Sequence, residues 1–400
     1  MSKPGPHAQT LGPLFSTDKD SAVITASLQS LLERARKDPH QLKKLQKALR
    51  RPERFMRAVV QAFVSATAKT VPVIFRSLKA NGPAMLRERR AMIAAFERRL
   101  YKTWRRPLDL LEMLIVASAE AGESASAQWP WKESKDRSLV FDVVRRLQAR
   151  ACQVACEVLT LLKTGYAPAA HARWRTLHET AVTAAFIAKH GKPAAERFLA
   201  HEHVEAKKAA RQYQRYTRRL GQVRYSLKEM ATFRRRHRAK LKKYGPQFKD
   251  DYGWAAVTLG VKRATFADIE KDVGLDHMRP YYKMASYPVH ATVKAIRFSL
   301  ALAPGQDLLL TGPSNLGLTD PGHGAAIALA QTTITMLTML PTSDSISVSQ
   351  VLLSFADEIG QAFLVAQKAL LKKGKPHGHR ARPRRSGLKP HVKAGRATRP

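Results

Sequence analysis

Four short groups of residues carry side chains that could move protons or hold an anion. The first lies within ARWRTLHETAV, where Arg173, His178 and Glu179 follow one another. Histidine can give and take a proton near neutral pH, and arginine can stabilise a developing negative charge. The alternative interpretation is structural, with Arg175 and Glu179 forming an ion pair four residues apart and His178 packing against a neighbouring helix.

The second group is HEHVE at 201–205. His201 and Glu205 share one helix face, and a carboxylate that orients a histidine would serve a catalyst. Glu205 stands where the zincin motif H-E-x-x-H has its second histidine, so the group does not predict a zinc site. We favour a helix surface for this group.

The third and fourth groups are DYGW at 251–254 and SYPVH at 286–290. Ser286 can cap a helix whose first turn accepts Pro288, which places His290 one turn inside that helix. His290 could then meet the helix of the first group in a polar cleft. The structural alternative is a buried, hydrogen-bonded histidine.

The spacing of Arg173 and His178 resembles the motif of the HEPN helical ribonucleases, an arginine followed four to six residues later by a histidine. The resemblance implies a metal-independent ribonuclease in which two motifs meet across a dimer interface, and a homodimer is therefore left open. On an unbroken helix, residues five apart point about 140° away from each other. The catalytic candidates are Arg173, His178, Glu179 and His290.

The order of the groups resembles a bacterial family, domain of unknown function 5677. The similarity covers roughly residues 140–340 and implies a mainly helical domain without a verified active site. The pieces that carry it are ARWRTLHETAV at 172–182, RFLAHEHVEAKKA at 197–209, YGWA at 252–255, YYKMASYPVHA at 281–291 and GPSNLGLTDPG at 312–322.

The strongest charge signal runs from Ala206 to Lys249, where sixteen Lys or Arg residues accompany one acid, Glu229, and six Tyr or Phe residues. Such a segment repels itself unless an anion neutralises it, which predicts a nucleic-acid partner. The aromatic residues Tyr213, Tyr216, Tyr225 and Phe233 could stack on unpaired bases of RNA or DNA. RNA is the partner favoured over DNA. The residues expected to contact it are Arg211, Arg215, Arg218, Arg219, Arg234, Arg235, Arg236, Arg238, Tyr213 and Tyr216.

The whole chain has the same bias, since 70 Lys and Arg against 31 Asp and Glu leave a net charge of +39. A hydrophobic content of 44% is enough for a core and argues against a disordered polycation. The two cysteines, Cys152 and Cys156, lie on successive helical turns without a matching pair of ligands, which predicts buried thiols in a reducing compartment. No metal or other cofactor is expected.

The start of the chain does not predict export, and no transmembrane segment is expected. The start, MSKPGPHAQTLGPLF, has no continuous apolar region of the kind that signal peptides carry. The uncharged run Ala325–Leu340 is shorter than the roughly 20 residues that span a bilayer, so we expect a buried helix there. The expectation is a cytoplasmic protein without integral membrane insertion.

The elements that would position these residues are helices, because apolar residues recur at three- and four-residue steps and alternating strand patterns do not occur. The fold class predicted is all-α, a multi-helix bundle. The helix that contains the first group is expected to end at Gly191, and the next helix is expected to run from about Ala194 to Gly221. The regions expected are a flexible lead (1–20), an N-terminal region of three to five helices (21–122), a linker (123–136), a main helical domain (137–370) and a disordered basic tail (371–400). The Gly- and Pro-rich stretch 304–324 predicts a loop, either a binding loop or a passive connection.

The leading functional hypothesis is a helical protein that binds RNA through its basic helices. It could act as an RNase-like effector in a toxin or phage-defence setting. The alternative is a non-enzymatic interaction protein whose basic faces meet an acidic partner or an anionic membrane surface.

Overall fold

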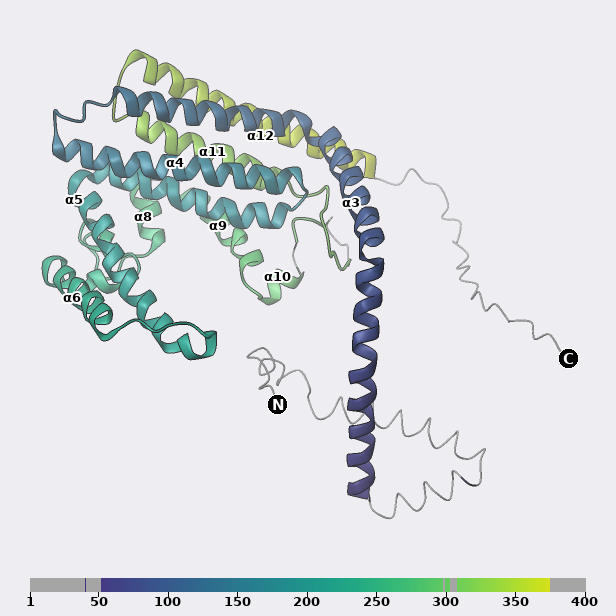
Figure 1. The fold of residues 1–400 in the computed structure, drawn as a ribbon. Helices are drawn as coiled ribbons and strands as arrows, with labels where there is room; N and C mark the ends of the chain where they lie inside the picture. Colours follow the sequence, from purple (N-terminus) through teal and green to yellow (C-terminus); the bar gives the residue numbers. More distant parts are fainter. Residues whose placement is uncertain (1–39, 41–51, 298, 303–307, 375–400) are drawn as a thin grey trace. The chain divides into compact units, whose positions relative to one another are not determined.

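The computed structural model describes residues 40, 52–297, 299–302 and 308–374. Every regular element within these ranges is a helix, which confirms the all-α class (Figure 1). The predicted lead at 1–20 lies outside the described residues, as does the predicted tail from 375 onward. The long helices are α3 (Pro52–Gln128), α4 (Lys135–Lys163), α5 (Ala167–Leu220), α6 (Leu227–Tyr244), α11 (Thr319–Leu337) and α12 (Ser343–Gly374).

Between α6 and α11 the chain forms short helices. They are η2 (Pro246–Lys249), α7 (Gly253–Ala256), α8 (Phe266–Asp272), η3 (Asp276–Met278), α9 (Arg279–Ala285), η4 (Tyr287–Val289) and α10 (Val293–Arg297). Helix α8 begins with a capping box, in which Thr265 and Asp268 each bond the backbone N–H of the other. This cap fixes the start of the helix that carries Glu270.

The chain divides into two compact units. Among the described residues, the first contains 40, 52–96 and 203–239, and the second contains 97–202, 240–297, 299–302 and 308–374. Helices α3, α5 and α6 each contribute residues to both units.

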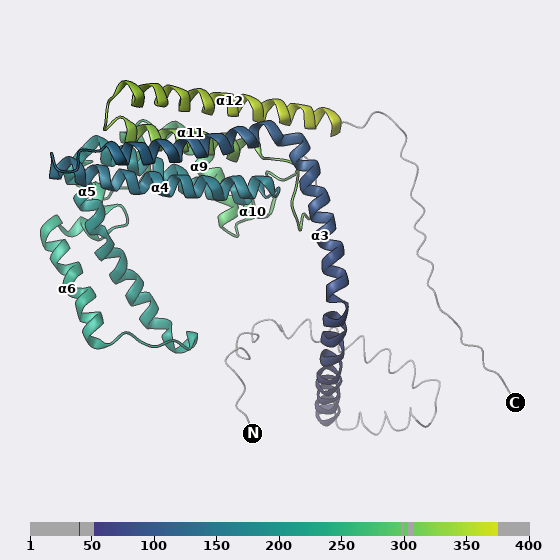
Figure 2. The same ribbon diagram turned by 45° about the horizontal axis from the view of Figure 1, so that its top comes forward.

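The second unit is a bundle of long helices. It contains the C-terminal part of α3, α4, the first part of α5, α11 and α12, with α11 packed against both α4 and α12 (Figure 2). Trp104 of α3 meets Phe363 of α12 at 5.9 Å between ring centroids. The largest fully buried side chains are Trp104, Trp174, Phe141, Phe186, Phe248, Phe363, Leu100, Leu108, Leu111, Leu114, Leu162 and Leu177.

Small residues let α11 approach its neighbours closely. A Cβ on Gly324 would lie 2.7 Å from the indole Nε1 of Trp174, and one on Gly322 would enter the ring of Phe363. The sequence predicts a loop through Gly324, but α11 already begins at Thr319. These glycines are helix-packing positions, because only a residue without a side chain fits there.

The helix boundaries around the candidate residues follow local signals. Ser134 caps α4 by accepting a hydrogen bond from the N–H of Arg137. Helix α5 is interrupted at Gly191, which has φ 66°, and it ends before Gly221, which has φ 65°. Glycine tolerates these positive φ values, so the break and the end fall where the sequence predicts them.

The described part of the N-terminal helical region, residues 52–122, is not divided at its prolines as the sequence predicts. Within this part the prolines predict breaks, yet α3 runs unbroken from Pro52 to Gln128 and includes Pro72, Pro83 and Pro107. A proline removes one backbone hydrogen bond and bends a helix without necessarily ending it. Helix α3 also takes up the first part of the predicted linker.

One helix among the described residues, α12, has a segment long and apolar enough to cross a membrane, at Ser343–Lys372. A third of its most apolar window, 33%, is buried in the bundle. Leu352, Ile359 and Phe363 are the residues of α12 that are fully buried and apolar. The run Ala325–Leu340, predicted to be a buried helix, belongs mostly to α11.

Candidate nucleic-acid interface and polar cluster

In the first unit, the C-terminal part of α5 and the helix α6 lie side by side as a hairpin (Figure 1). We call residues 203–239 the basic hairpin. Ser226 and Glu229 form a capping box at the start of α6: the Ser226 N–H donates to Glu229 Oε2 at 2.7 Å, and the Glu229 N–H donates to Ser226 Oγ at 3.2 Å. The turn between the helices is therefore defined by local hydrogen bonds.

Aromatic side chains hold the basic hairpin together. The ring of Tyr225 lies 5.1 Å from that of Tyr213 and 5.5 Å from that of Phe233. Gln214 bonds both the N–H and the C=O of Tyr225, at 2.9 and 3.0 Å. Three of the four aromatic residues expected to stack on bases thus pack on one another. The fourth, Tyr216, is half-buried.

The arginines of the hairpin face solvent. All eight that the sequence predicts to contact nucleic acid are exposed: Arg211, Arg215, Arg218, Arg219, Arg234, Arg235, Arg236 and Arg238. Glu229 is the one acid between 206 and 239, and it caps α6. Burial, Lys207 and Lys208 lower the pKa of His237, as expected in a positive field. The surface is therefore strongly cationic.

In the second unit, a buried ionic group links α5 to α8 and α9. His178 Nε2 lies 2.8 Å from Oε1 of Glu270, and the two side chains are 1% and 0% exposed. Arg279 Nε lies 2.8 Å from Oε2 of Glu270, an ion-pair distance, although its N–H is not aimed for a hydrogen bond. The carboxylate is thus held between two basic groups.

A second set of polar contacts lies beside it. Arg175 Nε is 3.2 Å from Glu179 Oε1, and its Nη1 donates to Ser286 Oγ at 3.3 Å. The Tyr282 hydroxyl donates to Glu179, and the Arg175 guanidinium lies 4.6 Å from the Tyr282 ring centroid. Burial, followed by the bond to Glu179, raises the pKa of Tyr282. We call Arg175, His178, Glu179, Glu270, Arg279 and Tyr282 the polar cluster.

Aromatic rings pack along the same helix face. The His171 ring stacks on Trp174 at 5.3 Å, and Trp174 stacks on His178 at 5.5 Å. Burial lowers the pKa of His171 to about 4. His171 is therefore a neutral side chain of the core at physiological pH.

The candidate Arg173 points away from the polar cluster. Its guanidinium pairs with Glu157 of α4 and donates to Thr176 Oγ1 at 3.3 Å. His178 instead contacts Glu270 of α8. Arg173 and His178 thus point in different directions, as expected for residues five apart on a helix. The i,i+4 ion pair of Arg175 and Glu179 and the packing of His178 match the structural interpretation of this segment.

His290 is not placed as the sequence predicts. Ser286 and Pro288 do not start an α-helix that contains it, because η4 ends at Val289. His290 follows in an extended conformation with φ −114° and ψ 138°, and it is exposed. The buried alternative for this histidine is therefore wrong as well.

The other two groups form packing contacts. His201 is buried, and its Nε2 lies 2.8 Å from the carbonyl oxygen of Asp250. Trp254 of the DYGW group meets Phe186 and Phe198 edge-on, at 5.4 and 5.1 Å. A Cβ on Gly253 would collide with the backbone of the preceding turn. These residues fix the chain between α6 and α8.

Sequence reasoning missed three members of the polar cluster, Glu270, Arg279 and Tyr282. Tyr282 lies within the resembling piece YYKMASYPVHA, which was the available signal. Glu270 and Arg279 carry no local pattern, because their partner His178 lies 92 residues from Glu270 in the sequence.

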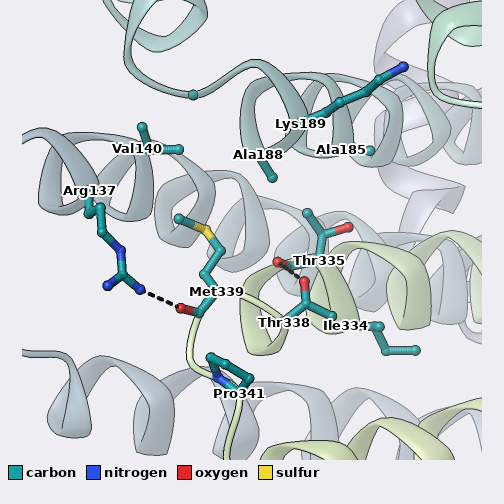
Figure 3. A pocket seen from close by; sticks show the side chains of 11 residues that line it. Arg137, Val140, Ala185, Ala188, Lys189, Ile334, Thr335, Thr338, Met339 and Pro341 are labelled. Carbon is teal, nitrogen blue, oxygen red and sulfur yellow. Dashed lines mark hydrogen bonds between the residues drawn. The ribbon is translucent and has the colours of Figure 1, made fainter.

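A separate open pocket of about 670 Å³ lies where α4, α5 and α11 meet (Figure 3). Arg137 Nη2 donates to the carbonyl of Met339 at 3.2 Å across it. The remaining lining is mostly apolar, and the residues predicted for catalysis or nucleic-acid contact are not part of it. The lining residues are Arg137, Val140, Ala185, Ala188, Lys189, Gly191, Ile334, Thr335, Thr338, Met339 and Pro341.

The cysteines differ in their surroundings. Cys152 is half-buried, and burial raises the pKa of its thiol to about 11. Cys156 is exposed, so the expectation of two buried thiols is wrong for this residue. Within the part of the chain that the structure describes, no group of three or more His, Cys, Asp or Glu residues could hold a metal ion.

Residues 141–306 match the model of a protein family described as a family of unknown function, DUF5677. The resemblance seen in the sequence is confirmed over this span, while the piece at 312–322 lies outside it. The matched region contains both the basic hairpin and the polar cluster. The chain has no match among curated proteins and none among solved structures.

Proposed function

We propose that this protein binds RNA through the basic hairpin, chiefly by contacts to the phosphate backbone. The observation that carries the proposal is the exposure of all eight predicted arginines within residues 206–239, where the one acid, Glu229, is used as a helix cap. Cationic side chains in this number release counterions when they neutralise phosphates, which supplies sequence-independent affinity.

The hairpin supports this role because contacts within the chain join its two helices. Its aromatic contacts pack α5 against α6, and the capping box at Ser226 defines the start of α6. Arginines on helices that are already paired lose less conformational freedom on binding than arginines on an unfolded segment.

Base stacking has a smaller part in the proposal than the sequence suggests. The ring of Tyr225 already packs against those of Tyr213 and Phe233 within the hairpin. Tyr216, with the Arg215 guanidinium 5.5 Å from its ring centroid, is the remaining platform for an unpaired base. We therefore expect weak sequence preference. We keep RNA as the proposed partner, and DNA of the same sequence is the comparison that tests this choice.

The test is an electrophoretic mobility shift with RNA and DNA of the same sequence over a series of salt concentrations. The logarithm of the association constant should fall linearly with the logarithm of the salt concentration. The slope should be about −0.7 for each phosphate contact on a single strand. An affinity that does not change with salt would remove phosphate neutralisation as the basis of binding. Flotation with anionic liposomes tests the first version of the alternative, binding to an anionic membrane surface. Binding of an acidic protein together with no binding of RNA would favour the second version, an acidic protein partner.

A ribonuclease activity of Arg173, His178, Glu179 and His290 stays a prediction. The polar cluster favours it in one respect, since Arg175 and Glu179 are half-buried and hydrogen-bonded to Ser286 and Tyr282. The burial of His178 opposes direct contact with a substrate. Incubation of total RNA with the wild type and with the His178→Ala and His290→Ala variants decides it, because equal cleavage excludes both histidines.

We propose a cytoplasmic setting, because cellular RNA is present there. An effector in toxin or phage-defence systems would be one context for an RNA-binding protein of this kind. The test is to express the protein in cells and to examine the cellular RNA. RNA cleavage by the wild type that is lost in a variant without a catalytic candidate would support that context. Normal growth with unchanged RNA would argue against it.

A further inference from the structure

The part of α3 in the first unit carries an apolar stripe that faces solvent. Starting at Val60, alternating steps of four and three residues lead to Met85 and pass through eight positions in all. Six of these positions are apolar, and two, Thr67 and Asn81, are polar. The six apolar side chains are 46% to 60% exposed. This spacing is the heptad pattern of coiled-coil helices. The apolar stripe residues are Val60, Val64, Val71, Ile74, Leu78 and Met85.

The charges of this segment lie away from the stripe. Lys69, Arg76 and Lys79 are at positions about 130° or more from its centre. The positions that flank the stripe carry no charge between Gln61 and Ala84. Two copies of this basic helix could therefore meet along the stripe without bringing like charges together.

The two ends of the pattern define its length. The repeat from Val60 to Met85 is about 38 Å long at 1.5 Å per residue, and it contains between three and four heptads, the minimum that indicates a coiled coil. Glu88 occupies the next position of the register, and its charge ends the stripe. The pairing is therefore expected to be short and of moderate stability.

We propose that the stripe pairs with the same stripe of a second copy of this chain, as a two-stranded coiled coil. The uncharged flanks give no reason to select an acidic partner. Thr67 and Asn81 are polar within the repeat, and a polar residue at such a position fixes the register at a cost in stability.

The test is the mass of the full-length protein by sedimentation equilibrium, in high salt that releases nucleic acid but preserves apolar contacts. The wild type should have twice the chain mass of 44.6 kDa. Val71→Glu should have the mass of one chain. Val73→Glu is the matched control, because Val71 and Val73 are 55% and 56% exposed but only Val71 lies on the stripe.

A second variant separates pairing from misfolding. Asn81→Leu extends the apolar stripe and should lower the dimer dissociation constant about tenfold or more. A misfolded protein would not gain affinity in this way. A wild type with the mass of one chain overturns the proposal, as would happen if residues 1–51 or another partner covered the stripe. Equal masses for Val71→Glu and Val73→Glu overturn it too.

Discussion

His178 and Glu270 form a hydrogen-bonded pair of 2.8 Å in which neither side chain is more than 1% exposed. Buried carboxylates are costly unless they are paired, and Arg279 provides the second partner of Glu270. This pair joins α5 to the short helices that follow α6. A histidine identified in the sequence as a catalytic candidate therefore has a structural role in the second unit.

The first prediction concerns this pair. Glu270→Gln removes the charge between His178 and Arg279 and should lower the free energy of unfolding by about 3 kcal/mol, because Arg279 loses its counter-charge. Urea denaturation followed by circular dichroism measures this change. Glu123→Gln is the control, since Glu123 is exposed. Equal small effects of the two substitutions would contradict a structural role for Glu270.

The second prediction concerns pH. The pKa of His171 is lowered to about 4 in the folded protein, whereas an unfolded histidine titrates near 6.5. Between these values the unfolded state binds the proton more strongly, so stability is full above pH 6.5 and falls as pH drops toward 4. The loss from this group is about 3 kcal/mol.

His171→Phe keeps a ring beside Trp174 and cannot titrate. Its free energy of unfolding should change less between pH 7 and pH 4.5 than that of the wild type. The same change in both proteins would show that His171 does not contribute to acid sensitivity.

The third prediction uses two helical glycines. Gly324→Ala places a methyl group against the Trp174 indole, so we expect a loss of about 1–3 kcal/mol from overpacking. Gly82→Ala in α3 meets no atom within 4 Å and should stabilise the helix by about 0.5–1 kcal/mol. Thermal unfolding of both variants tests the prediction, which fails if Gly324→Ala is neutral.

The sequence predicted the features that depend on neighbouring residues. The helical class, the break at Gly191 and the end of α5 before Gly221 follow from periodicity and from glycine. The ion pair of Arg175 and Glu179 follows from helix geometry. These features need no knowledge of the tertiary structure.

Features that depend on tertiary packing were missed. Gly322 and Gly324 indicate a loop by composition, yet they lie in α11 because Phe363 and Trp174 occupy the space beside them. Likewise Tyr213 and Tyr225 could be assigned to base stacking until the hairpin brought their rings together. Nothing local in the sequence specifies these partners.

The central claim is that the basic hairpin binds the RNA backbone, and one comparison tests it most directly. Replacing Arg234, Arg235 and Arg236 together by Gln should weaken RNA binding. It should also reduce the slope of log affinity against log salt concentration by about 2. Replacing Arg87, Arg89 and Arg90 by Gln removes the same charge from exposed positions of α3 and should leave both nearly unchanged. If the affinity for RNA and its salt dependence fall equally in the two triple variants, binding depends on net charge alone. The hairpin is then not the RNA-binding site.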